Sequence, residues 1–313
     1  MINILYSKES KIIMIKKRKD RYFTPHQIIV LHSKKHKTYR ETKSLTQRLY
    51  KQTIRKPSTL FISIIQPLLW LVMFGALFQN APIYLFREYK LEYREFLNAG
   101  IIIFTAFNSS INAGITIVFD REFGFLNRIL ISPISNKNSL IYSCVIHTWL
   151  ITISQIMGII LITCYQNQKN ANYLNNISNL NNIIIAAIII TMIIISVSNL
   201  SICNALVLPG HIEFIGLTTF FLNLPTLFTS TALAPLSFMP NWLQVIACIN
   251  PLTYAIEIIR NLHLNKYFQL GETIVNIDSL QLSGIQGITI LLFTNIFSFI
   301  LVKNIIKYKY DKT

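Results

Sequence analysis

Charged residues are scarce in this chain. Asp, Glu, Lys and Arg together make up 13% of its 313 residues, whereas soluble domains carry about 25%. Hydrophobic residues account for 52%, and they are gathered in long runs. This composition argues against a soluble globular domain and predicts an integral membrane protein with several spans.

Cysteine is also scarce. The chain has four cysteines, none of which forms a CxxC pair: Cys144, Cys164, Cys203 and Cys248. Three of them fall in apolar runs, where small apolar packing residues are expected. The sequence therefore predicts neither a disulfide framework nor a metal site.

Motifs for catalysis and for nucleotide binding are missing as well. The chain contains no GxxxxGK[ST] phosphate loop, no HExxH, no GxSxG and no paired carboxylates in a loop. We therefore expect no catalytic residue and no cofactor-binding residue, and the chain is not predicted to be an enzyme. If it moves a substrate uphill, the energy must come from another polypeptide.

Six apolar runs are long enough to cross a bilayer, which needs about 20 residues. They lie at about 58–79, 98–119, 139–165, 182–208, 214–235 and 285–302. The two halves of the chain show no repeat, so an inverted-repeat secondary transporter is not supported. The predicted fold class is an all-α integral membrane protein with six transmembrane helices.

Basic residues set the expected orientation, because cytoplasmic loops are enriched in Lys and Arg. With both termini on the cytoplasmic or stromal side, 23 of the 29 Lys and Arg residues lie inside and six lie outside. This orientation places the basic N-terminal segment and the C-terminal tail on the same side of the membrane.

The six spans contain no Asp, Glu, Lys or Arg. Ion-coupled transporters and proton pumps need ionisable groups inside the membrane, so both classes are disfavoured. His147 is the one titratable candidate in the third span, and packing explains it better than a ligand or proton role. A passive channel is also disfavoured, because no ring of charges is present.

Amide and hydroxyl residues do occur in the spans. Their simplest role is hydrogen bonding between helices, and their alternative role is to line a polar path. For the fifth span the sequence leaves these two roles open. The candidates for lining a path are Asn108, Asn112, Asn223 and Thr226.

The N-terminal segment divides in two. Residues 1–38 are rich in lysine without a clear period, so we expect a poorly ordered extension. Residues 39–56 predict a basic amphipathic helix, with Leu45 and Leu49 on one side, and such a helix before a span is typical of the membrane interface. The basic cluster at Lys16–Arg21 is better explained by attraction to anionic lipid or by control of membrane topology than by binding of nucleic acid, since no nucleic-acid-binding fold accompanies it.

Residues 227–262 form an apolar stretch that prolines interrupt at three points. Each proline lacks a backbone N–H and clashes with the preceding turn, and broken backbone at membrane depth must be covered by protein or line a cavity. We therefore expect a re-entrant segment between the fifth and sixth spans, on the outer side. Its two charges, spaced i and i+3, are expected to pair with each other near the membrane boundary. The residues of this outer segment are Pro235, Pro240, Trp242, Pro251, Glu257 and Arg260.

Three blocks of sequence carry a family resemblance. They are PSTLFISIIQPLLWLVMFGALFQ at 57–79, FDREFGFLNRILISPIS at 119–135, and TALAPLSFMPNWL with NPLTYAIEIIR in the broken segment. Together they resemble the membrane subunit of ABC-2 type exporters, over about residues 40–310. The domain boundaries expected from this are 1–38 for the extension and 39–313 for the transmembrane domain. The Ile, Asn and Lys bias makes the chain look like a plastid-encoded form.

The resemblance implies a permease that works with separate ATPase subunits, which would bind ATP and Mg²⁺. Two permeases and two ATPases are expected, with this chain as a homodimer or as one of a permease pair. A cytoplasmic helix after the second span would dock on the ATPase, which assigns coupling to Asp120, Arg121, Glu122, Gly124 and Arg128. The outer re-entrant segment would cap the path as a gate.

The expected location is a plastid membrane, or otherwise a bacterial inner membrane. The alternative function is a non-transporting assembly factor for another membrane complex, which would bind its client through the outer loop 236–284. An associated ATPase distinguishes the two, since an assembly factor would need none.

Overall fold

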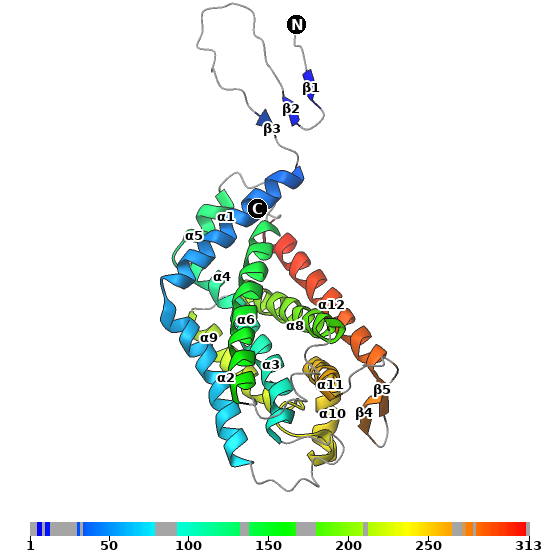
Figure 1. Cartoon of the computed structure of the whole chain (residues 1–313). Coiled ribbons are helices and arrows are strands. Elements are labelled where there is room, and N and C mark those ends of the chain that lie inside the picture. The colour runs from blue at the N-terminus through cyan, green and yellow to red at the C-terminus, as the bar shows by residue number, and fades with distance from the viewer. Residues whose placement is uncertain are drawn as a thin grey trace, which may run out of the picture.

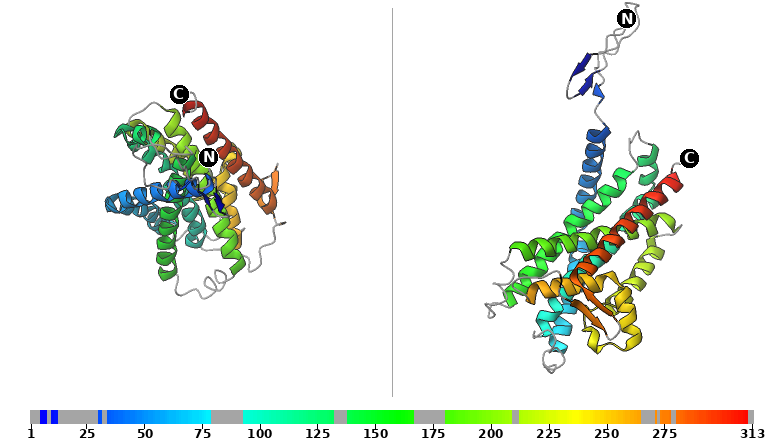
Figure 2. Two further views of the ribbon diagram at one scale, coloured as in Figure 1. Left: turned by 90° about the horizontal axis from the view of Figure 1, so that it is seen from above. Right: turned by 90° about the vertical axis from the view of Figure 1, so that its right-hand side faces the viewer.

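The computed structural model describes residues 5–7, 10–12, 30–31, 34–78, 93–131, 138–166, 180–208, 212–264, 271, 273–277 and 280–310. Most of these residues form a bundle of helices (Figure 1). Helix α1 (Lys34–Ile54) and the C-terminal end of α12 (Gly284–Tyr310) lie at one end of the bundle. Helix α10 (Asn241–Ile249) and strands β4 (Thr273–Ile277) and β5 (Leu280–Ser283) lie toward the other end, as both side views show (Figures 1 and 2).

Each of the six predicted spans coincides with helix. Four stretches are long and apolar enough to cross a membrane: Glu95–Glu122, Asn138–Thr163, Leu180–Val207 and Gly284–Tyr308. They belong to α3 (Tyr93–Ile111) with α4 (Ala113–Glu122), to α6 (Asn138–Gln166), to α8 (Leu180–Val207) and to α12.

The first predicted span corresponds to α2 (Pro57–Leu77). The fifth corresponds to α9 (Ile212–Phe228), which ends before the predicted limit at residue 235. Their continuous apolar parts, Ser63–Leu77 and Gly216–Phe228, are shorter than a full span. Each helix also contains an internal proline, Pro67 and Pro225. The helices are therefore where the sequence predicts them, while the count of six crossings stays a prediction.

Helix α1 begins at Lys34, five residues before the predicted start at Tyr39, so the prediction of poor order was wrong for residues 34–38. Lysine and other unbranched side chains lose little rotamer freedom in a helix, which allows the extension. Leu49 is buried where α1 packs on α6, as its apolar side requires. The remainder of the predicted extension lies largely outside the described residues.

Two small antiparallel sheets were not predicted. Strands β1 (Leu5–Ser7), β2 (Ser10–Ile12) and β3 (Val30–Leu31) form one, and β4 with β5 forms a two-stranded ribbon between α11 (Pro251–Leu264) and α12. The fold is mostly helical rather than entirely so. The β4–β5 ribbon packs against α11, which places it beside the broken segment.

The second predicted span contains a break that the sequence did not reveal. Helix α3 ends at Ile111 and α4 begins at Ala113, with Asn112 between them. The Ser201 hydroxyl of α8 donates to the Ile111 carbonyl and accepts the Gly114 N–H at 2.9 Å. One side chain thus satisfies two backbone groups that the break releases, which a buried helix end requires.

The broken segment has its interruptions at the three predicted prolines. Pro235 precedes the short helix η2 (Leu236–Phe238), Pro240 precedes α10, and Pro251 is the first residue of α11. Helices α10 and α11 meet at an angle of 88°, as in a broken span or a re-entrant loop. The prediction of broken backbone here is confirmed, and it follows from the missing N–H and fixed φ of proline.

Candidate functional site

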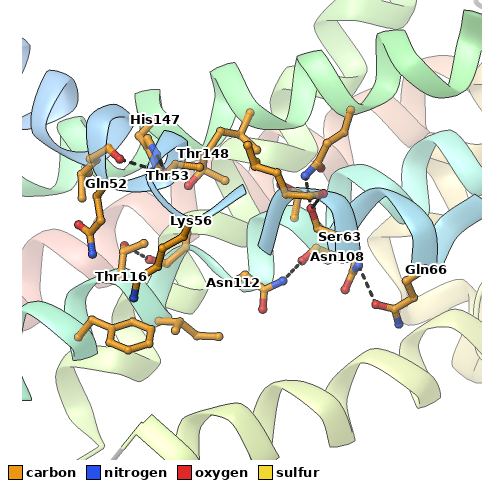
Figure 3. Close-up of a pocket in the computed structure, with 18 residues that line it drawn as sticks. Gln52, Thr53, Lys56, Ser63, Gln66, Asn108, Asn112, Thr116, His147 and Thr148 are labelled. Carbon is orange, nitrogen blue, oxygen red and sulfur yellow. Dashed lines mark hydrogen bonds between the residues drawn. The ribbon is translucent and has the colours of Figure 1, made fainter. Parts of the chain in front are cut away.

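A cavity of about 410 Å³ lies between α1, α2, α3, α4 and α6 (Figure 3). It extends from Lys56 and Asn112, which are exposed, to Asn108 and Gln155, which are buried. Most of its polar lining consists of hydroxyl and amide groups: Gln52, Thr53, Ser63, Gln66, Asn108, Ser109, Asn112, Thr116, Thr148 and Gln155. Lys56 and His147 complete that lining, and helices α1 and α2 meet at its exposed end.

Hydrogen bonds join the deep part of the cavity to three helices. The Asn108 amide donates to Gln66 Oε1 at 3.3 Å, and Asn223 of α9 donates to Asn108 Oδ1 at 2.7 Å. The Gln155 amide donates to the Ser63 hydroxyl at 2.7 Å. These contacts connect α2 to α3 and α6, and α3 to α9, through polar groups, so a change in the tilt of α2 would alter the cavity.

The exposed end is organised around the junction of α1 and α2. The Thr53 hydroxyl lies 2.8 Å from His147 Nε2, which joins α1 to α6. Lys56 Nζ lies 5.3 Å from the centre of the Phe119 ring on α4. His147 is thus engaged with a neighbouring helix, as its interpretation as a packing residue requires.

The candidates for lining a path divide into two groups. Asn108 and Asn112 line the cavity. Asn223 contacts it indirectly through Asn108, while the Thr226 hydroxyl donates to the Leu222 carbonyl of its own helix. Sequence reasoning missed Gln66 and Gln155, whose signal was an amide side chain inside an apolar run.

The five residues assigned to coupling lie around the end of α4 and the start of α5 (Phe125–Ile131). Asp120 is buried, and its carboxylate accepts hydrogen bonds from both terminal nitrogens of Arg48 on α1. Arg48 Nη1 lies 2.8 Å from Asp120 Oδ1. The guanidinium of Arg48 also lies 4.1 Å from the centre of the Phe125 ring. Arg48 therefore clamps α1 to both α4 and α5, which the sequence analysis did not foresee, since the pair is 72 residues apart.

Arg121 points to α8 instead. Its Nη1 donates to the carbonyls of Ala205 and Leu208, at 3.1 and 3.0 Å. These carbonyls belong to the last turn and the end of α8, where a cation is favoured by the helix dipole. Asp120 and Arg121 thus hold the helices together from within.

The exposed part of this region is apolar as well as charged. Glu122 and Arg128 are exposed, and Phe123 and Ile131 are 75% and 86% exposed. Gly124 has φ +68°, a left-handed conformation that favours glycine, and it turns the chain from α4 into α5. This surface, formed by Glu122, Phe123, Arg128 and Ile131, is called the α5 surface below.

The two charges of the broken segment are buried inside the bundle. Glu257 and Arg260 are 0% and 1% exposed, and they form the predicted i, i+3 ion pair inside the bundle. Arg260 Nη2 donates to the Thr231 carbonyl at 2.8 Å, and the guanidinium lies 3.5 Å from the centre of the Phe96 ring. Tertiary packing brings α3 and residues 229–232 over α11, which encloses the pair, while its position relative to the membrane boundary stays a prediction.

The other residues of the broken segment differ in exposure. Pro235 is buried, whereas Pro240 is exposed and the Trp242 side chain is 66% exposed on α10. Among the described residues, no group of three or more His, Cys, Asp or Glu side chains is placed to hold a metal ion.

Comparison with known proteins supplies the family. The ABC-2 type transporter family matches residues 40–264. The transport permease ycf38 of Porphyra purpurea is 42% identical over 267 residues, covering 85% of this chain and 89% of that relative. Proteins of the same name from Cyanophora paradoxa and Pyropia yezoensis are 40% and 41% identical over 265 and 274 residues, covering 84% and 88% of this chain and 88% and 91% of the relatives.

The matched family and the relatives identify a membrane transport protein of the permease class. The chain belongs to the ABC-2 type transporter family. Its relatives named above are encoded in the plastid genomes of red algae and a glaucophyte.

Proposed function

We propose that this chain is the membrane permease of an ATP-driven exporter and that the cavity is its part of the translocation path. One observation carries the proposal: the helices that enclose the cavity are joined to the α5 surface through the Arg48–Asp120 pair. A rigid-body displacement of α5 would move α1, and the junction of α1 and α2 forms the exposed end of the cavity.

The motor in this proposal is a separate ATPase subunit that binds ATP and Mg²⁺. The α5 surface is its docking site, because Phe123 and Ile131 expose large apolar side chains beside Glu122 and Arg128. Apolar residues with a charged rim are typical of protein interfaces. Gly124 sets the angle at which α5 leaves α4.

The assembly would contain two permeases, either two copies of this chain or this chain with another permease. Helices α2 and α9 expose apolar side chains to lipid or to a second permease, including Phe61 and Met73 on α2 and Phe220 and Phe221 on α9. Six crossings, with both termini on the stromal side, agree with α1 and the end of α12 lying at one end of the bundle. Plastid-encoded relatives support a plastid membrane. Outward direction rests on the family resemblance alone.

Copurification tests the partner. The full chain, purified from its native membranes, should retain a subunit with a Walker-motif phosphate loop. Phe123→Asp and Ile131→Asp should each reduce the retained ATPase, since a charge would replace a buried apolar contact. Gln281→Asp, which adds the same charge at an exposed site on β5, is the control. A pure, active transport preparation without any ATPase would contradict the proposal.

Coupling is tested by Arg48→Ala. The complex should still assemble, but substrate-stimulated ATP hydrolysis should fall severalfold because α1 is no longer clamped to Asp120. Lys43→Ala, an exposed change on the same helix, should leave stimulation unchanged. Exchanging the charges, with Arg48→Asp and Asp120→Arg together, should recover part of the stimulation. Equal stimulation in the Arg48→Ala and Lys43→Ala variants would sink the coupling route.

A further inference from the structure

A row of aromatic side chains connects the end of α2 to the start of α3. Trp70, Phe74 and Phe78 follow one another at intervals of four residues, with ring centres 5.4 and 6.1 Å apart. In the first turn of α3, the Tyr93 ring lies 5.0 Å from Phe78 and 6.2 Å from Phe96. Aromatic rings at these separations attract one another beyond the burial of their surface. These five residues are called the aromatic row below.

The row ends against the start of the broken segment. The guanidinium of Arg260 lies 3.5 Å from the centre of the Phe96 ring, and its Nη2 donates to the Thr231 carbonyl at 2.8 Å. The Tyr93 hydroxyl donates to the Leu233 carbonyl at 3.1 Å. The first turn of α3 therefore contacts both the aromatic side chain that follows α2 and the backbone of the broken segment.

A second connection between α2 and the broken segment is direct. The Trp70 ring also lies 6.5 Å from the Phe228 ring, in an edge-on arrangement. Phe228 is the last residue of α9 and lies at the start of the broken segment. A displacement of the end of α2 would therefore either break these contacts or carry the start of the segment with it.

Helix α10 is tied to the same part of the chain. The Gln244 amide donates to the carbonyls of Leu236 and Met239, at 3.1 and 2.8 Å. Asn250, directly after α10, donates to the Thr226 carbonyl at 3.2 Å. The end of α2 lies toward the same end of the bundle as α10 (Figures 1 and 2). A displacement of the start of the segment would therefore reach α10.

Pro67 divides α2 into two parts. Before it, Leu60, Ser63 and Gln66 line the cavity, and after it the helix carries Trp70 and the next members of the aromatic row. A proline inside a helix removes one backbone hydrogen bond and clashes with the preceding turn, so bending is concentrated there. The cavity and the broken segment are thus connected to α2 on opposite sides of one hinge position.

We propose that α2 pivots at Pro67 and that the aromatic row carries this motion to the broken segment, so that the shape of the cavity and the position of α10 change together. The members of the row are positioning residues, and Arg260 joins the row to the segment. This inference goes beyond the proposed function, because it concerns motion within this chain and needs no ATPase.

Spin-label distances measured by pulsed electron paramagnetic resonance test the connection in the purified full chain. The labels are placed at exposed positions of a variant whose four native cysteines are replaced by alanine. Ile249→Cys reports α10, Leu77→Cys reports the end of α2, and Lys303→Cys on α12 is the common reference. Dilution with unlabelled chain restricts the measurement to distances within one chain. Pro67→Ala restores the hydrogen-bonding capacity of α2 and should shift the distances from the reference to both other labels.

Removing the row should separate these two shifts. With Trp70→Leu and Phe78→Leu together, Pro67→Ala should still shift the label at Leu77. The shift at Ile249 should fall severalfold, because α10 no longer follows α2. Trp70→Phe with Phe78→Tyr keeps both rings and should preserve the shift at Ile249.

The controls separate the row from aromatic packing in general. Phe293→Leu with Phe297→Leu removes an exposed stacked pair from α12, whose ring centres lie 6.4 Å apart, and should leave both shifts intact. Tyr93→Phe removes the hydroxyl that donates to Leu233 while keeping the ring, and it should lose part of the shift at Ile249. This variant carries the test if the doubly substituted row fails to fold.

A label at Leu77 that moves while the label at Ile249 stays in place would overturn the connection, and so would an undiminished shift of α10 after removal of the row. No movement at Leu77 in the Pro67→Ala variant would overturn the hinge. Loss of the α10 shift in the α12 control would show that the row is not its cause. Because these measurements involve no ATPase, their failure leaves the exporter proposal standing, and failure of the ATPase copurification leaves this connection standing.

Discussion

Replacing Arg260 by alanine should destabilise the folded protein by about 3–5 kcal/mol, the usual cost of removing one partner of a buried ion pair. The substitution leaves the Glu257 carboxylate inside the bundle without its cation. It also removes the hydrogen bond to the Thr231 carbonyl and the stacking on Phe96. Thermal or denaturant unfolding in detergent would measure the loss.

The controls separate a buried charge from a lost contact. Lys303→Ala removes an exposed cation from α12 and should leave stability nearly unchanged. Replacing both partners, Glu257→Leu with Arg260→Met, should recover much of the loss, because well-packed apolar pairs can replace buried ion pairs. If Arg260→Ala and Lys303→Ala unfolded at the same midpoint, the pair would have no structural role.

Gly100→Ala and Gly114→Ala should each destabilise the protein by about 1–3 kcal/mol or more through overpacking. A Cβ at Gly100 would lie 2.3 Å from the Ala232 carbonyl oxygen, and one at Gly114 would lie 2.4 Å from that of Ser201. Both obstacles are backbone atoms, which cannot rotate away as a side chain can. Two backbones must therefore separate to admit a single methyl group.

Gly158 and Gly216 supply matched controls for these variants. Both also lie in helices, and a Cβ added at either meets no atom within 4 Å. Gly158→Ala and Gly216→Ala should be neutral or slightly stabilising, since alanine is the better helix former. A similar loss of stability in all four variants would show that close backbone packing is not the cause.

These two predictions bear on the proposed gate. Arg260 ties α11 to residues 229–232, and Gly100 lets α3 approach Ala232. The Tyr93 hydroxyl also donates to the Leu233 carbonyl at 3.1 Å. The start of the broken segment is thus anchored to α3. If the segment opens a path, we expect α10 to move, because its Trp242 and Ile249 side chains are exposed.

The residues assigned to coupling differ in whether their side chains pack inside the bundle or are exposed. Arg121→Ala would remove the hydrogen bonds to the end of α8 and is expected to lower stability. It therefore cannot separate coupling from folding. Glu122, Phe123 and Arg128 are exposed and are better placed for contact with an ATPase.

The helices and the breaks of the fold were largely predictable, because they depend on local properties. Long apolar runs give helices at 57–77, 138–166, 180–207 and 284–310, and proline removes a donor wherever it occurs. The break at Asn112 was not predictable, because the group that stabilises it is Ser201, on another helix. The early start of α1 and the β4–β5 ribbon were missed because their signals were weak.

The site was predicted in part. Asn108 and Asn112 were identified because amides stand out in an apolar run, while the partners of Asn108 on α2 and α9 could not be read from spacing. The assignment of residues to coupling came from the family resemblance and stays a prediction, and the resemblance does not show which of these side chains face inward.

The sequence by itself determined that this is a membrane protein, because the scarcity of charge and the long apolar runs are properties of the chain alone. Tertiary structure decided which polar groups work together. Arg48 meets Asp120, Arg260 meets Thr231, and Gln155 meets Ser63 only after the helices have packed. Contacts between residues far apart in the chain depend on the rotation and crossing of each helix, and a period of 3.6 residues leaves both unspecified.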